Sequence, residues 1–124
     1  MQTRRRWAVV VAVMGLVPAL LRAQEPTIYA PGDGVSLPVA TKQMQPQYTP
    51  DAMRNRIEGS VELSAVVLAN GTVGEVKVIR SLDSEHGLDT QAVKAMKMWE
   101  FKPGTKDGKA VAVRVAVLMT FTMK

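Results

Sequence analysis

The stretch that decides the fold is SVELSAVVLANGTVGEVKVIRS, residues 60–81. Its first half alternates apolar and polar side chains, and the apolar positions are Val61, Leu63, Ala65 and Val67. The alternation resumes after Asn70-Gly71. Alternation is typical of a β-strand with one buried face, and Asn-Gly is the dipeptide best suited to a two-residue hairpin turn. We therefore predict two antiparallel strands, over residues 60–69 and 72–81.

Two helices are predicted around this hairpin. Residues 88–99 have a helical period, in which one face holds Leu88, Ala92, Ala95, Met96 and Trp99. A shorter helix over residues 52–56 begins at Thr49-Pro50-Asp51, which supplies an N-cap hydroxyl, a proline at the first helical position and an acid in the first turn. It ends near Gly59. Because this helix is only about two turns long, packing must hold it.

The last segment follows a turn at Asp107-Gly108 and has the clearest alternation of all. One face carries Val111, Val113, Val115, Val117, Met119 and Phe121, and the other carries Ala112, Arg114, Ala116, Thr120 and Thr122. The order of elements predicts an α+β domain, with a three-stranded antiparallel sheet in the order 2-1-3 and both helices on its one apolar face. The last strand then lies at a sheet edge with unpaired backbone groups.

The first 23 residues differ in composition from the rest of the chain. Three arginines at positions 4–6 precede an uncharged apolar run over residues 7–21, and Ala23 is a small residue at the expected cleavage point. We interpret residues 1–23 as a secretory signal peptide. The alternative is a short membrane anchor, but the apolar run reaches only about 22 Å across a hydrocarbon core of ~30 Å.

The remaining chain is divided into an arm and a domain. Residues 24–42 are rich in proline and glycine. Within them, residues 35–39 are predicted to form a short strand. This strand is expected at a sheet edge, because Pro38 has no N–H to donate to a neighbouring strand. Residues 43–124 form the folded domain. The chain has no cysteine, which excludes disulfides, a thiol catalyst and lipobox lipidation. An exported, cysteine-free domain is expected in the periplasm.

Charge gives no support to a nucleic-acid partner. Four of the 16 basic residues and none of the 11 acidic residues lie in the predicted signal peptide, which leaves 12 against 11 and a net charge of about +1. A nucleic-acid-binding domain needs a basic surface.

The loop at residues 82–89 holds the only histidine and is the one candidate for metal or catalytic chemistry. Asp83, Glu85, His86 and Asp89 are compatible with a metal site, but they are also typical of a polar loop that caps a helix. Met96, Met98, Met119 and Met123 raise the alternative of Cu(I) binding, although two of these positions are on predicted core faces. No phosphate loop or serine-centred elbow is present. We predict no enzyme, no metal and no cofactor.

Several motifs in a fixed order resemble the C-terminal domain of the TonB energy-transducer family. They are QPQYTPDA at 45–52, RIEG at 56–59, LANGTVGEVKVIRS at 68–81, LDTQAVKAMKMWEFKPG at 88–104 and the closing strand. The resemblance covers roughly residues 43–124. It implies a domain that binds an extended peptide near the N-terminus of outer-membrane transporters, in energy-dependent transport. The peptide is added as a strand to the edge of the last strand, which is where our own prediction leaves an open edge.

The resemblance also implies which residues meet the peptide. They are Gln45, Pro46, Gln47 and Tyr48 before the first helix, and Val111, Val113, Val115 and Val117 in the last strand. Arg114, on the non-core face of that strand, is a further candidate to meet an acidic or carbonyl group of a partner, and the alternative is a solvated charge. The alternative for Tyr48 and Pro50 is that they hold the first helix on the sheet. Structural roles are predicted for Gly59, Asn70, Gly71, Trp99, Phe101 and Pro103, with the two rings locking the long helix to the sheet.

A complete transducer would also engage an inner-membrane proton-motive complex and carry a long spacer. Residues 7–21 lack the serine and histidine typical of such membrane helices, and residues 24–44 extend to at most ~70 Å. The resemblance therefore supports peptide binding more than force transmission. The competing interpretation is a periplasmic scaffold that uses the same edge for a homodimer or another partner.

Overall fold

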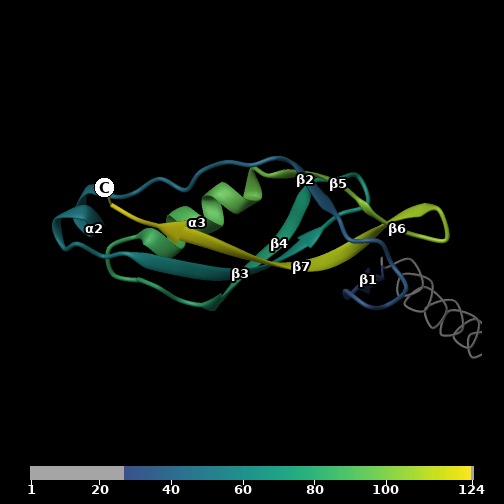
Figure 1. Cartoon of the computed structure of the whole chain (residues 1–124), viewed down its shortest axis with the longest axis horizontal. Helices are drawn as coiled ribbons and strands as arrows, with labels where there is room; N and C mark the ends of the chain where they lie inside the picture. The colour runs from purple at the N-terminus through teal and green to yellow at the C-terminus, as the bar shows by residue number, and fades with distance from the viewer. Residues whose placement is uncertain (1–26, 124) are drawn as a thin grey trace, which may run out of the picture.

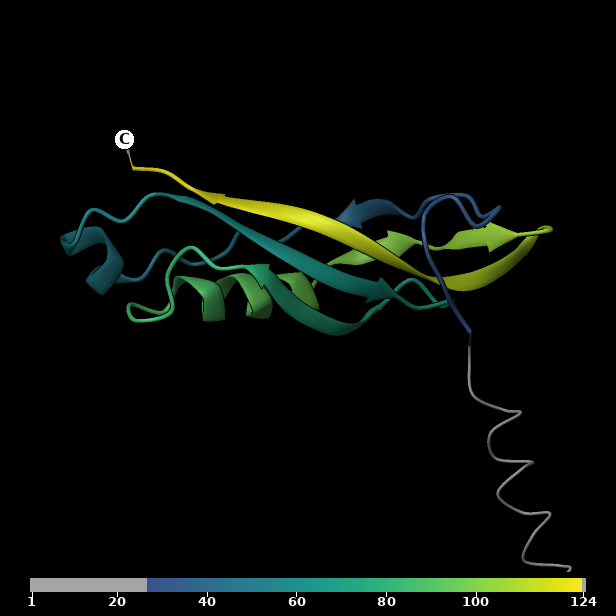
Figure 2. The same cartoon turned by 90° about the horizontal axis from the view of Figure 1, so that it is seen from below.

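The computed structural model describes residues 27–123, so the predicted signal peptide lies outside the described residues. Long twisted strands form one layer, and the longer helix lies against one side of them (Figures 1 and 2). The predicted α+β class is confirmed. Within residues 27–123, no helix has the length and apolar character needed to span a bilayer.

The predicted hairpin is present as β3 (Gly59–Val67) and β4 (Val73–Arg80), but its turn is different. The loop has three residues, 69–71, closed by a hydrogen bond from the Gly71 N–H to the Leu68 carbonyl at 2.8 Å. Within this loop, only Gly71 has a left-handed φ, at 88°. The Asn70 carboxamide oxygen instead accepts the Thr72 N–H at 3.0 Å, which stabilises a turn that needs left-handed backbone only at its last residue.

Strand β7 (Lys109–Phe121) pairs with β3 over residues 113–121. The three long strands are therefore neighbours in the order β4-β3-β7. The predicted count of three strands is wrong, because β1 (Ile28–Tyr29) adds to β7 in parallel and β6 (Gly104–Lys106) pairs with the start of β7. Strands of two or three residues are too short to show a period, so they escape sequence analysis.

A separate two-stranded sheet joins the arm to the domain. It consists of β2 (Val39–Lys42) and β5 (Glu100–Lys102), paired antiparallel. The strand predicted at residues 35–39 is thus wrong in position. Pairing begins only after Pro38, which has no N–H to donate.

Both predicted helices are present in the described part of the chain, as α2 (Pro50–Arg54) and α3 (Leu88–Lys97). Thr49 caps α2 as predicted, since its hydroxyl accepts the Ala52 N–H at 3.1 Å. The helix ends earlier than predicted because Arg56 has a φ of 53°. Figure 2 shows α3 along one side of the sheet and α2 near its end. Both contribute to one core, whose fully buried members include Ala52, Leu63, Leu88, Ala92 and Met96.

Candidate functional site

One backbone edge of β7 is open along most of its length. On one side, β3 occupies residues 113–121. On the opposite side, β1 pairs with Ala112 and Val113. Within the described part of the chain, no strand pairs with residues 114–121 on that second side. These eight residues span roughly 26 Å at ~3.3 Å per residue, and they have the unpaired groups that strand addition requires.

One hollow lies between β7 and the chain that leads from β2 into α2, and a second lies between β7 and residues before and within β2. One, of about 290 Å³, is lined by Gln43, Met44, Gln45, Pro46, Trp99, Leu118, Met119 and Thr120. The other, of about 370 Å³, is lined by Pro31, Leu37, Pro38, Ala40, Phe101, Val115, Ala116 and Val117. In Figure 1 the chain runs as one extended stretch from β2 to α2. We call residues 114–121 and the two hollows the edge groove.

The predicted segment 45–48 is only partly directed at the edge groove. Gln45 and Pro46 line it together with residues of β7. Gln47 instead faces α3, where a third hollow of about 300 Å³ is lined by Met44, Gln45, Gln47, Gln91, Lys94, Ala95 and Met98. The structure therefore brings together Gln45, Pro46 and β7, and leaves Gln47 on the helix side.

Tyr48 has structural contacts within the domain. Its hydroxyl donates a hydrogen bond to the Ile57 carbonyl, and its ring packs edge-on against Phe121 with centroids 5.4 Å apart. Burial, and then the charge of Glu58, raise the pKa of the Tyr48 hydroxyl, which keeps it a donor. These contacts support the alternative role, in which Tyr48 fastens the segment before α2 to the sheet.

Arg114 does not point to the open edge. Its Nη1 atom lies 3.6 Å from Glu75 Oε1 and 3.4 Å from Ser64 Oγ. Lys77 approaches the same Glu75 oxygen at 3.7 Å. Side chains on one face of neighbouring strands come within reach of each other, so Arg114 is engaged across the sheet. Sequence alternation identified its face but not this pairing.

Two of the four predicted valines lie outside the open stretch. Val113 pairs with both Val67 and Tyr29, and Val111 pairs with Gly104. The chain's own short strands occupy this part of β7, so only Val115 and Val117 lie in the edge groove. Sequence analysis missed Leu118, which is 62% exposed and lines the groove. Its signal was an apolar residue on the otherwise small or polar face of the last strand.

Trp99 positions the wall of the edge groove. Its indole N–H donates to the Met44 carbonyl at 3.0 Å, and the centroid of its ring lies 6.0 Å from the centroid of the Phe101 ring. The predicted structural role thus includes a different partner, because Trp99 holds the extended segment as well as the end of α3. Phe101, two residues after Trp99, is held in turn by Gly71, whose carbonyl accepts the Phe101 N–H at 2.8 Å.

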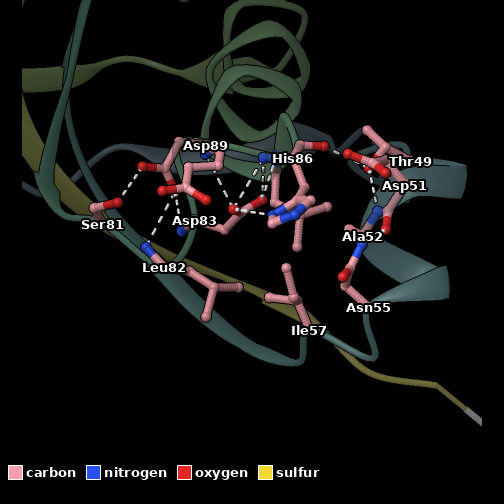
Figure 3. A network of polar contacts seen from close by, with 12 residues as sticks. Thr49, Asp51, Ala52, Asn55, Ile57, Ser81, Leu82, Asp83, His86 and Asp89 are labelled. Carbon is pink, nitrogen blue, oxygen red and sulfur yellow. Dashed lines mark hydrogen bonds and ion pairs between the residues drawn. The ribbon is translucent and has the colours of Figure 1, made fainter.

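The loop before α3 uses the carboxylates of Asp83 and Asp89 for backbone capping (Figure 3). Asp83 is 8% exposed and accepts the N–H groups of Glu85, His86 and Leu88. Asp89 accepts the N–H groups of Leu82 and Asp83. Among residues 27–123, no group of three or more histidine, aspartate or glutamate side chains is placed to hold a metal. The capping interpretation of this loop accounts for Asp83 and Asp89.

Comparisons with known proteins agree with this architecture. Residues 44–123 match the family described as Gram-negative bacterial TonB protein C-terminal. The chain is 37% identical over 91 residues to Protein TonB of Xanthomonas campestris pv. campestris (strain B100), which covers 73% of this chain and 40% of that protein. It is 41% identical over 78 residues to Protein tonB2 of Pseudomonas aeruginosa, covering 63% of this chain and 28% of that protein. The chain thus matches two fifths or less of the length of these relatives.

A solved structure has the same fold. The solution NMR structure of the Pseudomonas aeruginosa TonB CTD superposes with a TM-score of 0.58 at 24% identity, over 77% of this chain and 93% of that one. The family match covers well over half of the chain. The chain therefore belongs to the Gram-negative bacterial TonB protein C-terminal family.

Proposed function

We propose that this domain binds the N-terminal peptide of an outer-membrane transporter by strand addition at the edge groove, in energy-coupled transport. The observation that carries the proposal is the open edge of β7 at residues 114–121, beside two hollows. Family membership supports the same role. In strand addition, main-chain hydrogen bonds supply affinity and pockets for alternate side chains supply selectivity.

The two hollows differ in the side chains that they would select. All the residues that line the hollow at Val115 and Val117 are apolar, which suits an apolar side chain. The hollow at Leu118 also offers Gln45 and Thr120, whose polar groups suit hydrogen bonds to the peptide. Since Trp99 and Tyr48 already hold the wall in place, binding costs little ordering of the domain.

The proposal places the domain in the periplasm, where such a peptide is accessible, in accordance with the predicted signal peptide. It assigns the energy to a separate inner-membrane proton-motive complex. Peptide binding at the edge groove is the part that this chain's own residues perform.

An amide NMR titration tests the proposal. The ¹⁵N-labelled protein is titrated with synthetic peptides from the N-terminal periplasmic segments of outer-membrane transporters of the same organism. Shifts concentrated in residues 114–121 and at Gln45 are expected. A folded, monomeric sample that shifts with none of the peptides would refute transporter recognition.

The same edge is also compatible with a scaffold that pairs with a second copy. Sedimentation of the free protein at several concentrations distinguishes this function. A mass that rises with concentration, together with shifts at residues 114–121 without peptide, would favour the homodimer.

A further inference from the structure

The segment before β2 forms a hook at the beginning of the open edge. Strand β1 pairs with Ala112 and Val113, and the chain then turns at residues 30–33, where the Asp33 N–H donates to the Ala30 carbonyl at 3.1 Å. Figure 1 shows β1 at the end of the sheet where β6 and β7 meet. We call residues 28–36 the hook.

Several contacts fasten the hook to β6. The Lys106 ammonium lies 4.9 Å from the centroid of the Tyr29 ring and donates to the Asp33 carbonyl at 3.2 Å. The Ser36 N–H donates to the Thr105 carbonyl at 2.9 Å, and the Ser36 hydroxyl oxygen accepts the Thr105 N–H at 2.8 Å. The Asp33 carboxylate accepts the Ala30 N–H at 2.8 Å. The hook is thus held at both of its ends.

We propose that the hook is a stop that limits the length of peptide the edge accepts, an inference that rests on the proposed function. A backbone edge pairs with one strand at a time, and Val113 already has partners on both sides. An added strand therefore meets β1 end to end at residue 113. Pro31, two residues after the end of β1, lines the hollow at Val115 and Val117. About eight residues of edge, 114–121, remain for the peptide.

The test compares peptides extended past either end. The tightest-binding synthetic transporter peptide is lengthened by two residues at a time at its N-terminus and, separately, at its C-terminus, and affinities are measured by calorimetry with the full chain. In the unaltered protein, extending the peptide toward the hook is expected to leave its affinity unchanged. Each new main-chain hydrogen bond would otherwise strengthen binding about fivefold.

A variant removes the stop. Ile28→Pro combined with Tyr29→Pro deletes both N–H groups of β1, at least one of which faces β7, since successive residues of a strand point their N–H groups in opposite directions. In this variant, extending the peptide toward the hook is expected to raise its affinity about fivefold or more for each new hydrogen bond. Thr27→Pro is the control, because Thr27 is outside the paired residues, and it should behave as the unaltered chain.

The outcomes separate the two proposals. An equal gain from extension at both ends of the peptide in the unaltered chain would overturn the stop and leave the proposed function standing. No binding by any peptide would overturn both. The first comparison needs no variant, so it decides the matter even if the double proline substitution prevents folding.

Discussion

Gly71 occupies a position where a side chain does not fit. Its φ is 88°, and a Cβ atom there would lie 2.2 Å from the Phe101 carbonyl oxygen. Gly71→Ala is therefore expected to cost about 2–4 kcal/mol of unfolding free energy, from left-handed strain plus displacement of a backbone hydrogen bond. Urea denaturation measures the cost. Gly108→Ala is the control, because its φ is 80° but nothing lies within 4 Å, and it should cost only about 1 kcal/mol. Equal costs would contradict the packing argument.

His86 and Asp83 make stability depend on pH. The hydrogen bond that the His86 ring donates to the Asp83 carboxylate raises the pKa of His86 against a smaller opposing effect of burial, and the charges of Asp83, Asp51 and Glu85 raise it further. A histidine with a raised pKa contributes stability that is complete below its unfolded pKa of 6.5 and is lost as pH rises through the folded value. The unfolding free energy is therefore expected to fall as pH rises above 6.5, relative to His86→Asn.

Asp83 acts in a different pH range. Burial raises the pKa of Asp83, but hydrogen bonds from the His86 ring and from the His86 and Leu88 backbone outweigh it and leave the pKa below its ordinary value of 3.8. Its contribution is present above that value and lost in acid. Chemical denaturation of the protein and of His86→Asn between pH 5 and 8 therefore isolates the contribution of the histidine. If the unfolding free energies of the two proteins depend on pH in the same way, His86 does not stabilise the fold as proposed.

At the scale of elements, the side chains that β7 directs into the edge groove should control binding. Leu118 is 62% exposed in the groove wall, so Leu118→Lys is expected to weaken peptide binding about tenfold through lost apolar contact. Ile79→Lys on β4 is the matched control, because Ile79 is 55% exposed and lines none of the hollows beside β7. Calorimetric titration measures both affinities, and thermal melts should be unchanged. A similar loss in both variants would show that charge alone weakens binding.

Elements also show where sequence reasoning succeeded. The alternation in β3 and β7 and the helical period of α3 identify their buried faces, because each long element must present one face to the core. β1, β5 and β6 have no such signal. Their pairing depends on chain segments that the fold brings together, such as Ile28 opposite Ala112.

For the whole molecule, Trp99 links the helix, the extended segment and the groove. Trp99→Phe keeps a ring but removes the donor to Met44, and it is expected to cost about 1 kcal/mol. Faster hydrogen exchange at residues 43–47 and weaker peptide binding should accompany the loss. Thr41→Val is the control, since it removes an exposed hydrogen bond to the Glu100 carbonyl outside the groove. Unchanged exchange in Trp99→Phe would show that the segment is held by other contacts.

The amino-acid sequence by itself determined the α+β class, the hairpin of β3 and β4, the helical face of α3 and the buried face of β7, because these follow from local periodicity and burial. Only the tertiary structure decided which part of β7 stays open. Tyr29 occupies the edge at Val113, Arg114 reaches Glu75, and Trp99 bonds to Met44. Each of these contacts joins residues far apart in the chain, and no local pattern encodes the distance between such residues.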